Sequence, residues 1–149
     1  MLSIDRELKS LVEKLNALHI PYALCGGLAV AVHGYPRATL DIDLLALRGS
    51  SSHIEKTARD LGYTLRAGPM QFASGKITIV RISKTNPDDE DIVPLDILTL
   101  ESSLESSIRC QEAEWDGLTL QVISRKSLIM LKQLRNNHQD QADIEKLES

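Results

Sequence analysis

Hydrophobic residues recur every three or four positions in several segments, which is the period of an amphipathic helix. Over residues 3–18 four leucines and a valine follow this spacing, and Ser3 is a suitable residue for the helix N-terminus. The same pattern predicts helices over 28–33 and 52–61, a helix capped by Ser124 with Leu128, Leu131 and Leu134 facing inward, and a short helix over 140–147.

Short apolar segments between these helices predict β-strands. The strands are expected over 22–25, 41–47, 63–66, 76–82, 92–98 and 118–123. The polar acidic loop 86–91 predicts that the strands on either side of it pair in antiparallel fashion, and Asp116–Gly117 is a turn signal before the last strand.

The order of these elements predicts an α+β fold. Helices and strands alternate through the first part of the chain, mostly strands follow, and the chain ends in helices. This order fits a mixed β-sheet flanked by helices, with a helical C-terminus. No repeat or linker divides the 149 residues, so we expect a single domain over 1–149.

Composition and charge narrow the class of protein. Apolar residues make up 42% of the chain and charged residues 26%, as in ordinary globular proteins. The formal net charge of −4 argues against a broad surface for nucleic acid or for an anionic membrane. Cys25 and Cys110 have no metal-type spacing, so we expect both to be reduced and buried. The absence of a signal pattern and of an apolar run near 20 residues predicts a cytoplasmic protein with no membrane partner.

The stretch Leu24–Ala46 (LCGGLAVAVHGYPRATLDIDLLA) contains a candidate phosphate site. Gly26 and Gly27 open an apolar, helix-like run, and without Cβ atoms they leave backbone N–H groups accessible to a ligand. These N–H groups lie at the positive end of the predicted helix, which favours a phosphate. Arg37 and Thr39 follow in a short loop.

Acidic residues follow at the start of the next strand. Side chains at i and i+2 of a strand point to the same face, so Asp41 and Asp43 can converge on one cation. Asp96 lies in another apolar strand, which, next to the first, would bring it in as a third metal ligand or general base. Structural alternatives remain open. Asp41 and Asp43 would then cap an exposed strand end or pair with Arg37, and Asp96 would face water or pair with Arg81.

The C-terminal helices offer a further candidate. Lys132 lies on a polar helix face, from which it either reaches a cleft to hold a triphosphate or stays in solvent. Asp140 and Asp143 are one helical turn apart and either orient Lys132 or face water. The acidic run 88–91 is interpreted as a solvated loop. The sequence contains no P-loop, zinc or nucleophile motif.

The stretch beginning at Gly26 (GGLAVAVHGYPRATLDIDLL) resembles the signature of the nucleotidyltransferase fold, a superfamily that includes DNA polymerase beta. Asp96, within PLDIL, resembles its third carboxylate strand. The tail LIMLKQLRNNHQDQADIEKL resembles the closing helices of small bacterial members of the abortive-infection toxin type. In those helices a lysine precedes an aspartate by eight residues and a second aspartate follows three later, as Lys132, Asp140 and Asp143 do here.

The resemblance implies a Mg²⁺-dependent enzyme that moves a nucleoside monophosphate from a nucleoside triphosphate (NTP) to a hydroxyl acceptor. Asp41, Asp43 and Asp96 would be catalytic and would hold the metal. The residues that would bind the triphosphate are Gly26, Gly27, Arg37, Thr39 and Lys132. A toxin-like member would modify tRNA or protein and have a cognate antitoxin as a partner. The alternatives are an antibiotic-modifying enzyme of the aminoglycoside or lincosamide type and a non-catalytic nucleotide- or partner-binding module on the same fold.

Overall fold

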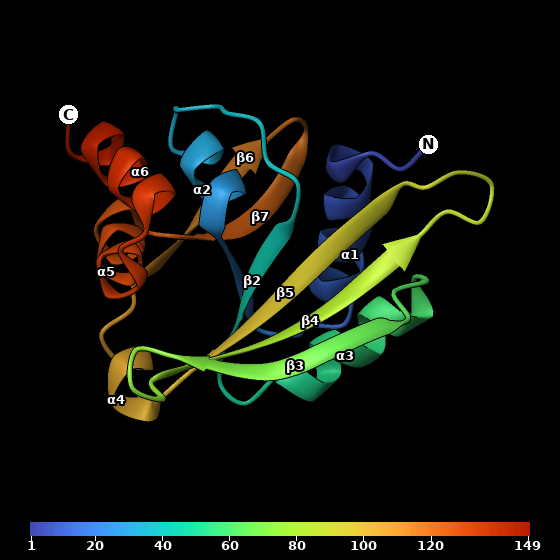
Figure 1. The fold of residues 1–149 in the computed structure, drawn as a ribbon, viewed down its shortest axis with the longest axis horizontal. Helices are drawn as coiled ribbons and strands as arrows, with labels where there is room; N and C mark the ends of the chain where they lie inside the picture. The colour runs from blue at the N-terminus through green and yellow to red at the C-terminus, as the bar shows by residue number, and fades with distance from the viewer.

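Seven strands form one sheet in the computed structural model, which describes residues 1–149 (Figure 1). The strand order is β3-β4-β5-β2-β1-β7-β6. The strands are β1 (Tyr22–Cys25), β2 (Ile42–Ala46), β3 (Leu65–Phe72), β4 (Ile77–Thr85), β5 (Ile92–Leu100), β6 (Cys110–Trp115) and β7 (Leu118–Ile123). The helices are α1 (Ile4–Ala17), α2 (Gly26–Val32), α3 (Ser51–Asp60), α4 (Ser102–Glu105), α5 (Arg125–Arg135) and α6 (His138–Glu148).

The sheet is mixed. β2 pairs with β5 and β1 pairs with β7 in parallel, while the other four pairings are antiparallel. α1 and α3 pack together on one face of the sheet, and α2, α5 and α6 lie on the other (Figure 1). The expected α+β class, the mixed sheet and the helical C-terminus are therefore confirmed.

A single cluster of 33 buried hydrophobic residues joins the helices to the sheet. It includes Leu8, Leu11 and Leu15 of α1, the apolar face of the first predicted helix. One domain over 1–149 stays a prediction, which this continuous core supports. None of the helices is both long enough and apolar enough to cross a membrane.

Several segments differ from the sequence expectation. β6 and α4 were not expected, because the polar residues of β6 give no apolar pattern and its pairing with β7 comes from the backbone. β3 runs on to Phe72, well past the expected end at residue 66. Leu134, expected to face inward, is 38% exposed. Cys110, expected to be buried, is exposed on an edge strand, whereas Cys25 is buried as expected.

Candidate active site

Three aspartates lie together where β2 and β5 run side by side. Asp43 and Asp96 are register partners on these two parallel strands, and Asp41 comes one residue before β2. Carboxylate oxygens of all three lie within 4.8 Å of one another. Strand alternation accounts for the shared face of Asp41 and Asp43, and the parallel pairing brings in Asp96 from 53 residues away in the chain. We call Asp41, Asp43 and Asp96 the acidic triad.

The triad carries more negative charge than its surroundings balance. Burial of Asp43, together with the neighbouring charges of Asp41 and Asp96, raises the pKa of Asp43 from 3.8 to about 8. Burial and the charge of Asp43 also raise the pKa of the Cys25 thiol, which lies next to the site. Like charges at this separation favour either a shared proton or a bound cation.

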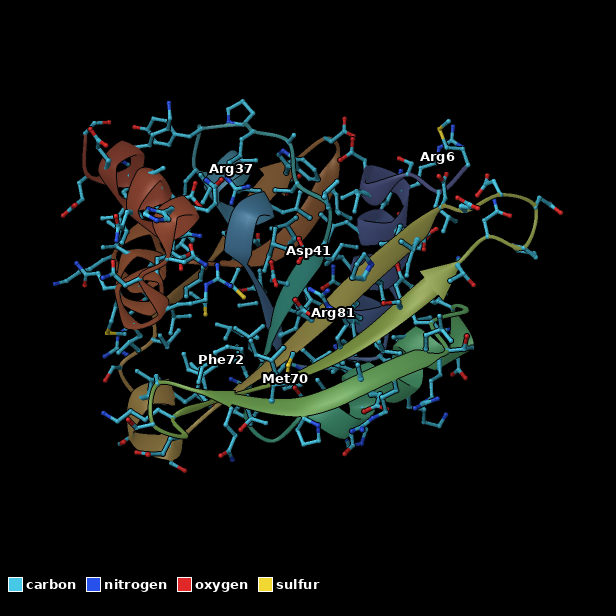
Figure 2. All side chains as sticks on the ribbon, in the orientation of Figure 1. Arg6, Arg37, Asp41, Met70, Phe72 and Arg81 are labelled. Carbon is cyan, nitrogen blue, oxygen red and sulfur yellow. The ribbon has the colours of Figure 1, made fainter.

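Arg81 on β4 supplies the positive charge that contacts the triad. Its Nε donates to Oδ1 of Asp96 at 2.8 Å and its Nη2 donates to Oδ2 at 2.9 Å, a bidentate pair. Nη2 also donates to Oδ2 of Asp41 at 3.2 Å (Figure 2). The pairing of Arg81 with Asp96, one of the alternatives open from the sequence, is thus present within the acidic triad itself. The hydrogen bonds to Asp96 raise the pKa of the Arg81 guanidinium.

The Gly26–Gly27 pair allows the loops of the site to approach α2 closely. Gly26 has φ +67°, and a Cβ there would lie 2.0 Å from Oδ2 of Asp43. A Cβ on Gly27 would lie 2.3 Å from Cγ2 of Thr39 and 2.9 Å from Nη2 of Arg37. Any side chain at either position would displace a residue of the candidate site, so glycine is required here for packing.

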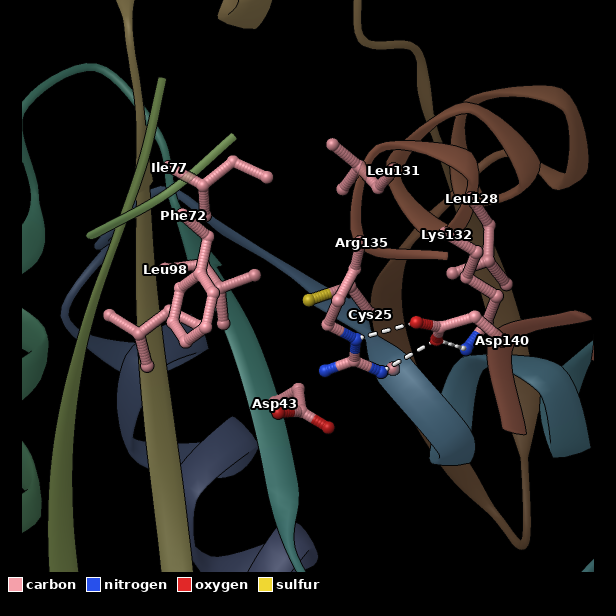
Figure 3. A pocket seen from close by; sticks show the side chains of 12 residues that line it. Cys25, Asp43, Phe72, Ile77, Leu98, Leu128, Leu131, Lys132, Arg135 and Asp140 are labelled. Atoms are coloured by element: carbon pink, nitrogen blue, oxygen red, sulfur yellow. Dashed lines mark hydrogen bonds and ion pairs between the residues drawn. The ribbon is translucent and has the colours of Figure 1, made fainter. Parts of the chain in front are cut away.

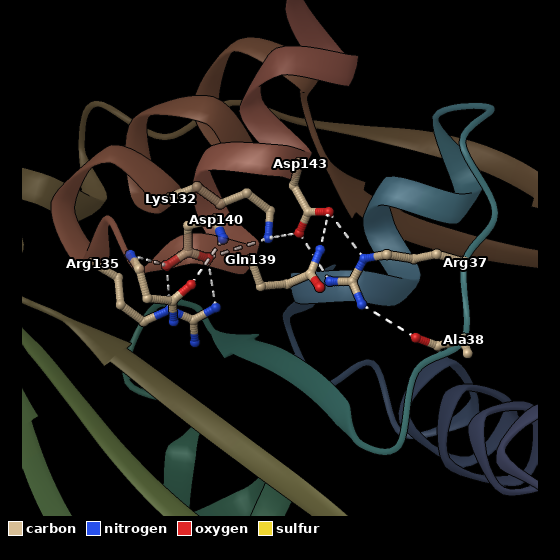
Figure 4. Close-up of polar contacts among 8 residues, drawn as sticks. Arg37, Ala38, Lys132, Arg135, Gln139, Asp140 and Asp143 are labelled. Carbon is tan, nitrogen blue, oxygen red and sulfur yellow. Dashed lines mark hydrogen bonds and ion pairs between the residues drawn. The ribbon is translucent and has the colours of Figure 1, made fainter.

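Arg37 does not pair with Asp41 or Asp43, as one alternative had it, but with Asp143 of α6 (Figure 4). Its Nε and Nη2 donate to the two oxygens of Asp143, each at 2.9 Å. This bidentate pair ties the loop between α2 and β2 to the C-terminal helices. It is part of a larger cluster, which we call the C-terminal ion network: Arg37, Lys132, Arg135, Asp140 and Asp143.

Lys132 is the buried centre of this network, with a side chain only 4% exposed. Its Nζ donates to Oδ2 of Asp143 at 2.9 Å and lies 3.6 Å from Oδ1 of Asp140. Arg135 makes a bidentate pair with Asp140, with both bonds 2.7 Å long. The alternatives of a solvated Lys132 and of aspartates facing water are therefore wrong, because packing of α6 on α5 buries all three side chains.

The aspartates of the network have lowered pKa values. Burial alone would raise the pKa of Asp143, but the hydrogen bonds from Arg37 and Lys132 outweigh it and lower the pKa. For Asp140, likewise, the bonds from Arg135 and from the Asn137 backbone outweigh burial. Both carboxylates are therefore held in the charged form.

A pocket opens beside Asp43, between the sheet and α5 (Figure 3). It holds about 520 Å³ of empty space, with the open solvent at its mouth included. One wall comes from β3, β4 and β5 and the other from α5, and polar residues are also part of the lining. The lining residues are Cys25, Gly26, Asp43, Phe72, Ile77, Ile79, Leu98, Leu128, Leu131, Lys132, Arg135 and Asp140.

Sequence reasoning missed the apolar wall of this pocket. Phe72 lies beyond the expected end of its strand, and neither Ile77 nor Leu98 is distinguishable by pattern from an ordinary core residue. The alternation of β4 was the available signal, since it places Ile77, Ile79 and Arg81 on one face.

The residues of the triad fit a divalent cation. Three carboxylates within 4.8 Å offer the oxygen ligands that hard cations prefer, and Arg81 is the one cation that forms ion pairs with them, so the site has a deficit of positive charge. Arg81 offsets part of this deficit. Of the predicted phosphate ligands, Gly26 and Lys132 line the adjoining pocket, whereas Arg37 and Thr39 pack against Gly27 beside it.

No protein-family model and no curated protein sequence matches this chain. Solved structures do match. An antigenic nucleotidyltransferase-like protein from Paracoccidioides brasiliensis has a TM-score of 0.59 at 20% identity, over 98% of this chain and 77% of that one. A nucleotidyltransferase candidate from Thermotoga maritima gives 0.57 at 19% identity, over 99% and 91%. ANT(2″)-Ia, in complex with adenylyl-2″-tobramycin, gives 0.64 at 13% identity, over 94% and 84%. The chain therefore has the nucleotidyltransferase fold.

Proposed function

We propose that this protein is a metal-dependent nucleotidyltransferase that transfers a nucleoside monophosphate from an NTP to a hydroxyl acceptor. The observation that carries the proposal is the acidic triad, three carboxylates brought together from two strands on a nucleotidyltransferase fold. A protein that kept this fold only to bind a nucleotide or a partner would not need all three carboxylates. Cytoplasmic location, where NTPs and Mg²⁺ are abundant, is part of the proposal.

Asp41, Asp43 and Asp96 are the proposed catalytic residues and the ligands for Mg²⁺. When bound, the ion supplies charge stabilisation at the phosphoryl oxygens. Asp96 lies among these ligands and is the proposed acceptor of the proton of the acceptor hydroxyl, once Arg81 no longer occupies both of its oxygens. No covalent nucleophile from the protein is required, because positioning and charge carry this chemistry.

The backbone N–H groups of Gly26 and Gly27 and the Thr39 hydroxyl are the proposed contacts to the triphosphate. Arg37 and Lys132 place positive charge beside it while Asp143 holds both cations in position. The apolar wall of the pocket next to Asp43 is the proposed contact for a nucleobase or for an acceptor with an apolar face.

For the acceptor we propose tRNA or protein, in a toxin-like role with a cognate antitoxin. The candidate that competes with it is an antibiotic-modifying enzyme, and the structural likeness to ANT(2″)-Ia, solved with an adenylylated tobramycin, favours that reading. The two differ in whether the label from an NTP is found on a macromolecule or on a small molecule.

The test is incubation of the full chain with each α-labelled NTP and Mg²⁺, in parallel with tRNA, with cell protein and with aminoglycosides and lincosamides. Label on any acceptor supports the proposal and identifies the acceptor class. Asp41→Asn should abolish labelling, whereas Asp88→Asn, in the exposed loop, should leave it unchanged. A well-folded Asp41→Asn protein that still labels an acceptor would falsify the assignment.

A further inference from the structure

Arg81 contacts the acidic triad, a group of three carboxylates with a deficit of positive charge. Its guanidinium bonds both oxygens of Asp96, at 2.8 and 2.9 Å, and one oxygen of Asp41, at 3.2 Å. Three of the six carboxylate oxygens of the triad therefore already accept from one cation, and this cation belongs to the protein itself.

The triad offers a divalent cation one oxygen from each carboxylate, and both oxygens of Asp96 already accept from Arg81. A carboxylate oxygen can accept more than one partner. A guanidinium and a divalent cation at the same oxygens nevertheless repel each other over a few ångströms, in a site that water screens only in part. Arg81 and the metal ion must therefore compete for Asp41 and Asp96.

The two sides of this ion pair differ in their freedom to move. The Arg81 side chain is 41% exposed and the Asp96 side chain 10% exposed. Arg81 also lies on the open face of the sheet, near Asp41 (Figure 2). Its long stem can therefore turn into solvent without opening the core, while Asp96 stays fixed on the strand next to Asp43.

We propose that Arg81 is an exchangeable counter-ion of the acidic triad. It holds Asp41 and Asp96 in place in the metal-free protein and leaves them when a divalent cation binds. Arg81 is thus a positioning residue that lowers the metal affinity of the site and keeps the empty site folded. The inference rests on the proposed function in so far as that function makes the triad a metal site.

The test compares Arg81→Met with Arg66→Met in the full chain. Arg66 lies on β3, next to β4, but it bonds Glu55 of α3 on the opposite face of the sheet, so it is a matched control. Binding of Mn²⁺ is measured by isothermal titration calorimetry. We expect Arg81→Met to lower the dissociation constant for Mn²⁺ by about tenfold. Arg66→Met should leave this constant at the wild-type value.

Thermal unfolding gives a readout that does not depend on turnover. Without metal, Arg81→Met should unfold at a lower temperature than Arg66→Met, because Asp96 is left buried without a partner. Saturating Mn²⁺ should raise the midpoint of Arg81→Met more than that of the wild type. Arg81→Lys, which keeps the charge but loses the bidentate bond, should bind Mn²⁺ with an intermediate affinity and serves if Arg81→Met does not fold.

Two results would overturn the inference, and they are distinguishable. If Arg81→Met and Arg81→Lys both bind Mn²⁺ with the wild-type affinity, Arg81 does not compete with the metal ion. The proposed function is then tested separately, by the labelling assay. If neither the wild type nor the variants bind Mn²⁺, the triad is no metal site, and the proposed function fails with the inference.

Discussion

The molecule contains two clusters of aspartates with opposite charge balance. In the acidic triad a single arginine, Arg81, pairs with two of the three carboxylates, and Asp43 has no ion pair. In the C-terminal ion network two carboxylates of α6, Asp140 and Asp143, are held by three cations, two from α5 and one from the loop before β2. The first cluster has a deficit of positive charge that a ligand can fill, whereas the second has none.

The pKa values of the aspartates follow this difference. Burial and two neighbouring carboxylates raise the pKa of Asp43 to about 8. In the network, bonds from arginine and lysine overcome burial and lower the pKa of Asp140 and of Asp143. Burial alone thus does not decide whether the pKa of an aspartate rises or falls, and the balance of nearby charges does.

The largest expected effect is on activity in the triad. Asp41→Asn should lower nucleotidyl transfer by about a thousandfold or more, because the proposed metal ligand and its charge are lost. The fold should be retained, since Asp41 lies outside β2 and is partly exposed. Labelling rates and thermal midpoints of the variant and of Asp88→Asn are compared. Loss of folding together with activity would contradict the difference that we draw between the clusters.

Removing a cation from the network should have a large effect on stability. Lys132→Met removes the cation between two buried carboxylates, Asp140 and Asp143, and should lower the free energy of unfolding by about 3–5 kcal/mol. Urea denaturation measures this, with Lys126→Met on the exposed face of α5 as the control. A loss below about 1 kcal/mol would show that the other cations compensate.

Removing a charge from the triad should stabilise the metal-free protein in a pH-dependent way. Because folding raises the pKa of Asp43 from 3.8 to about 8, this residue costs stability as pH rises through that window. Asp43→Asn removes the cost, so its advantage should grow from pH 4 to pH 8 and reach about 1–3 kcal/mol. Unfolding midpoints in EDTA from pH 5 to pH 9 test this. A constant difference between Asp43→Asn and wild type would contradict it.

The smallest expected effect is the acid response of the network. A carboxyl whose pKa is lowered by folding stabilises the protein above its unfolded pKa, and this contribution is lost as pH falls through the folded value. Asp140 and Asp143 should therefore make the wild type progressively less stable as pH falls below their unfolded pKa of 3.8. Asp143→Asn should unfold with a shallower dependence on pH in this range. If stability depends on pH equally steeply in Asp143→Asn and in the wild type, other groups cause the acid response.

The apolar periodicity was sufficient for most of the fold. β1 and β7 have the expected bounds, and α1, α3 and α5 lie where helical spacing placed them. β6 was not predictable, because an exposed edge strand is held by backbone pairing and needs no apolar pattern. The end of β3 was not predicted for a related reason, since the side chains of this strand are all exposed.

Within the candidate site, the sequence by itself determined what short-range geometry controls. Asp41 and Asp43 share a face because strand side chains alternate, whereas the approach of Asp43 to Gly26 became visible only in the fold. The tertiary structure decided which distant charges meet. It placed Arg81 on the triad and Arg37 on Asp143, pairings set by strand register and helix docking over tens of residues. Electrostatic partners depend on distance in space, and in this chain only the folded sheet and its helices fix that distance.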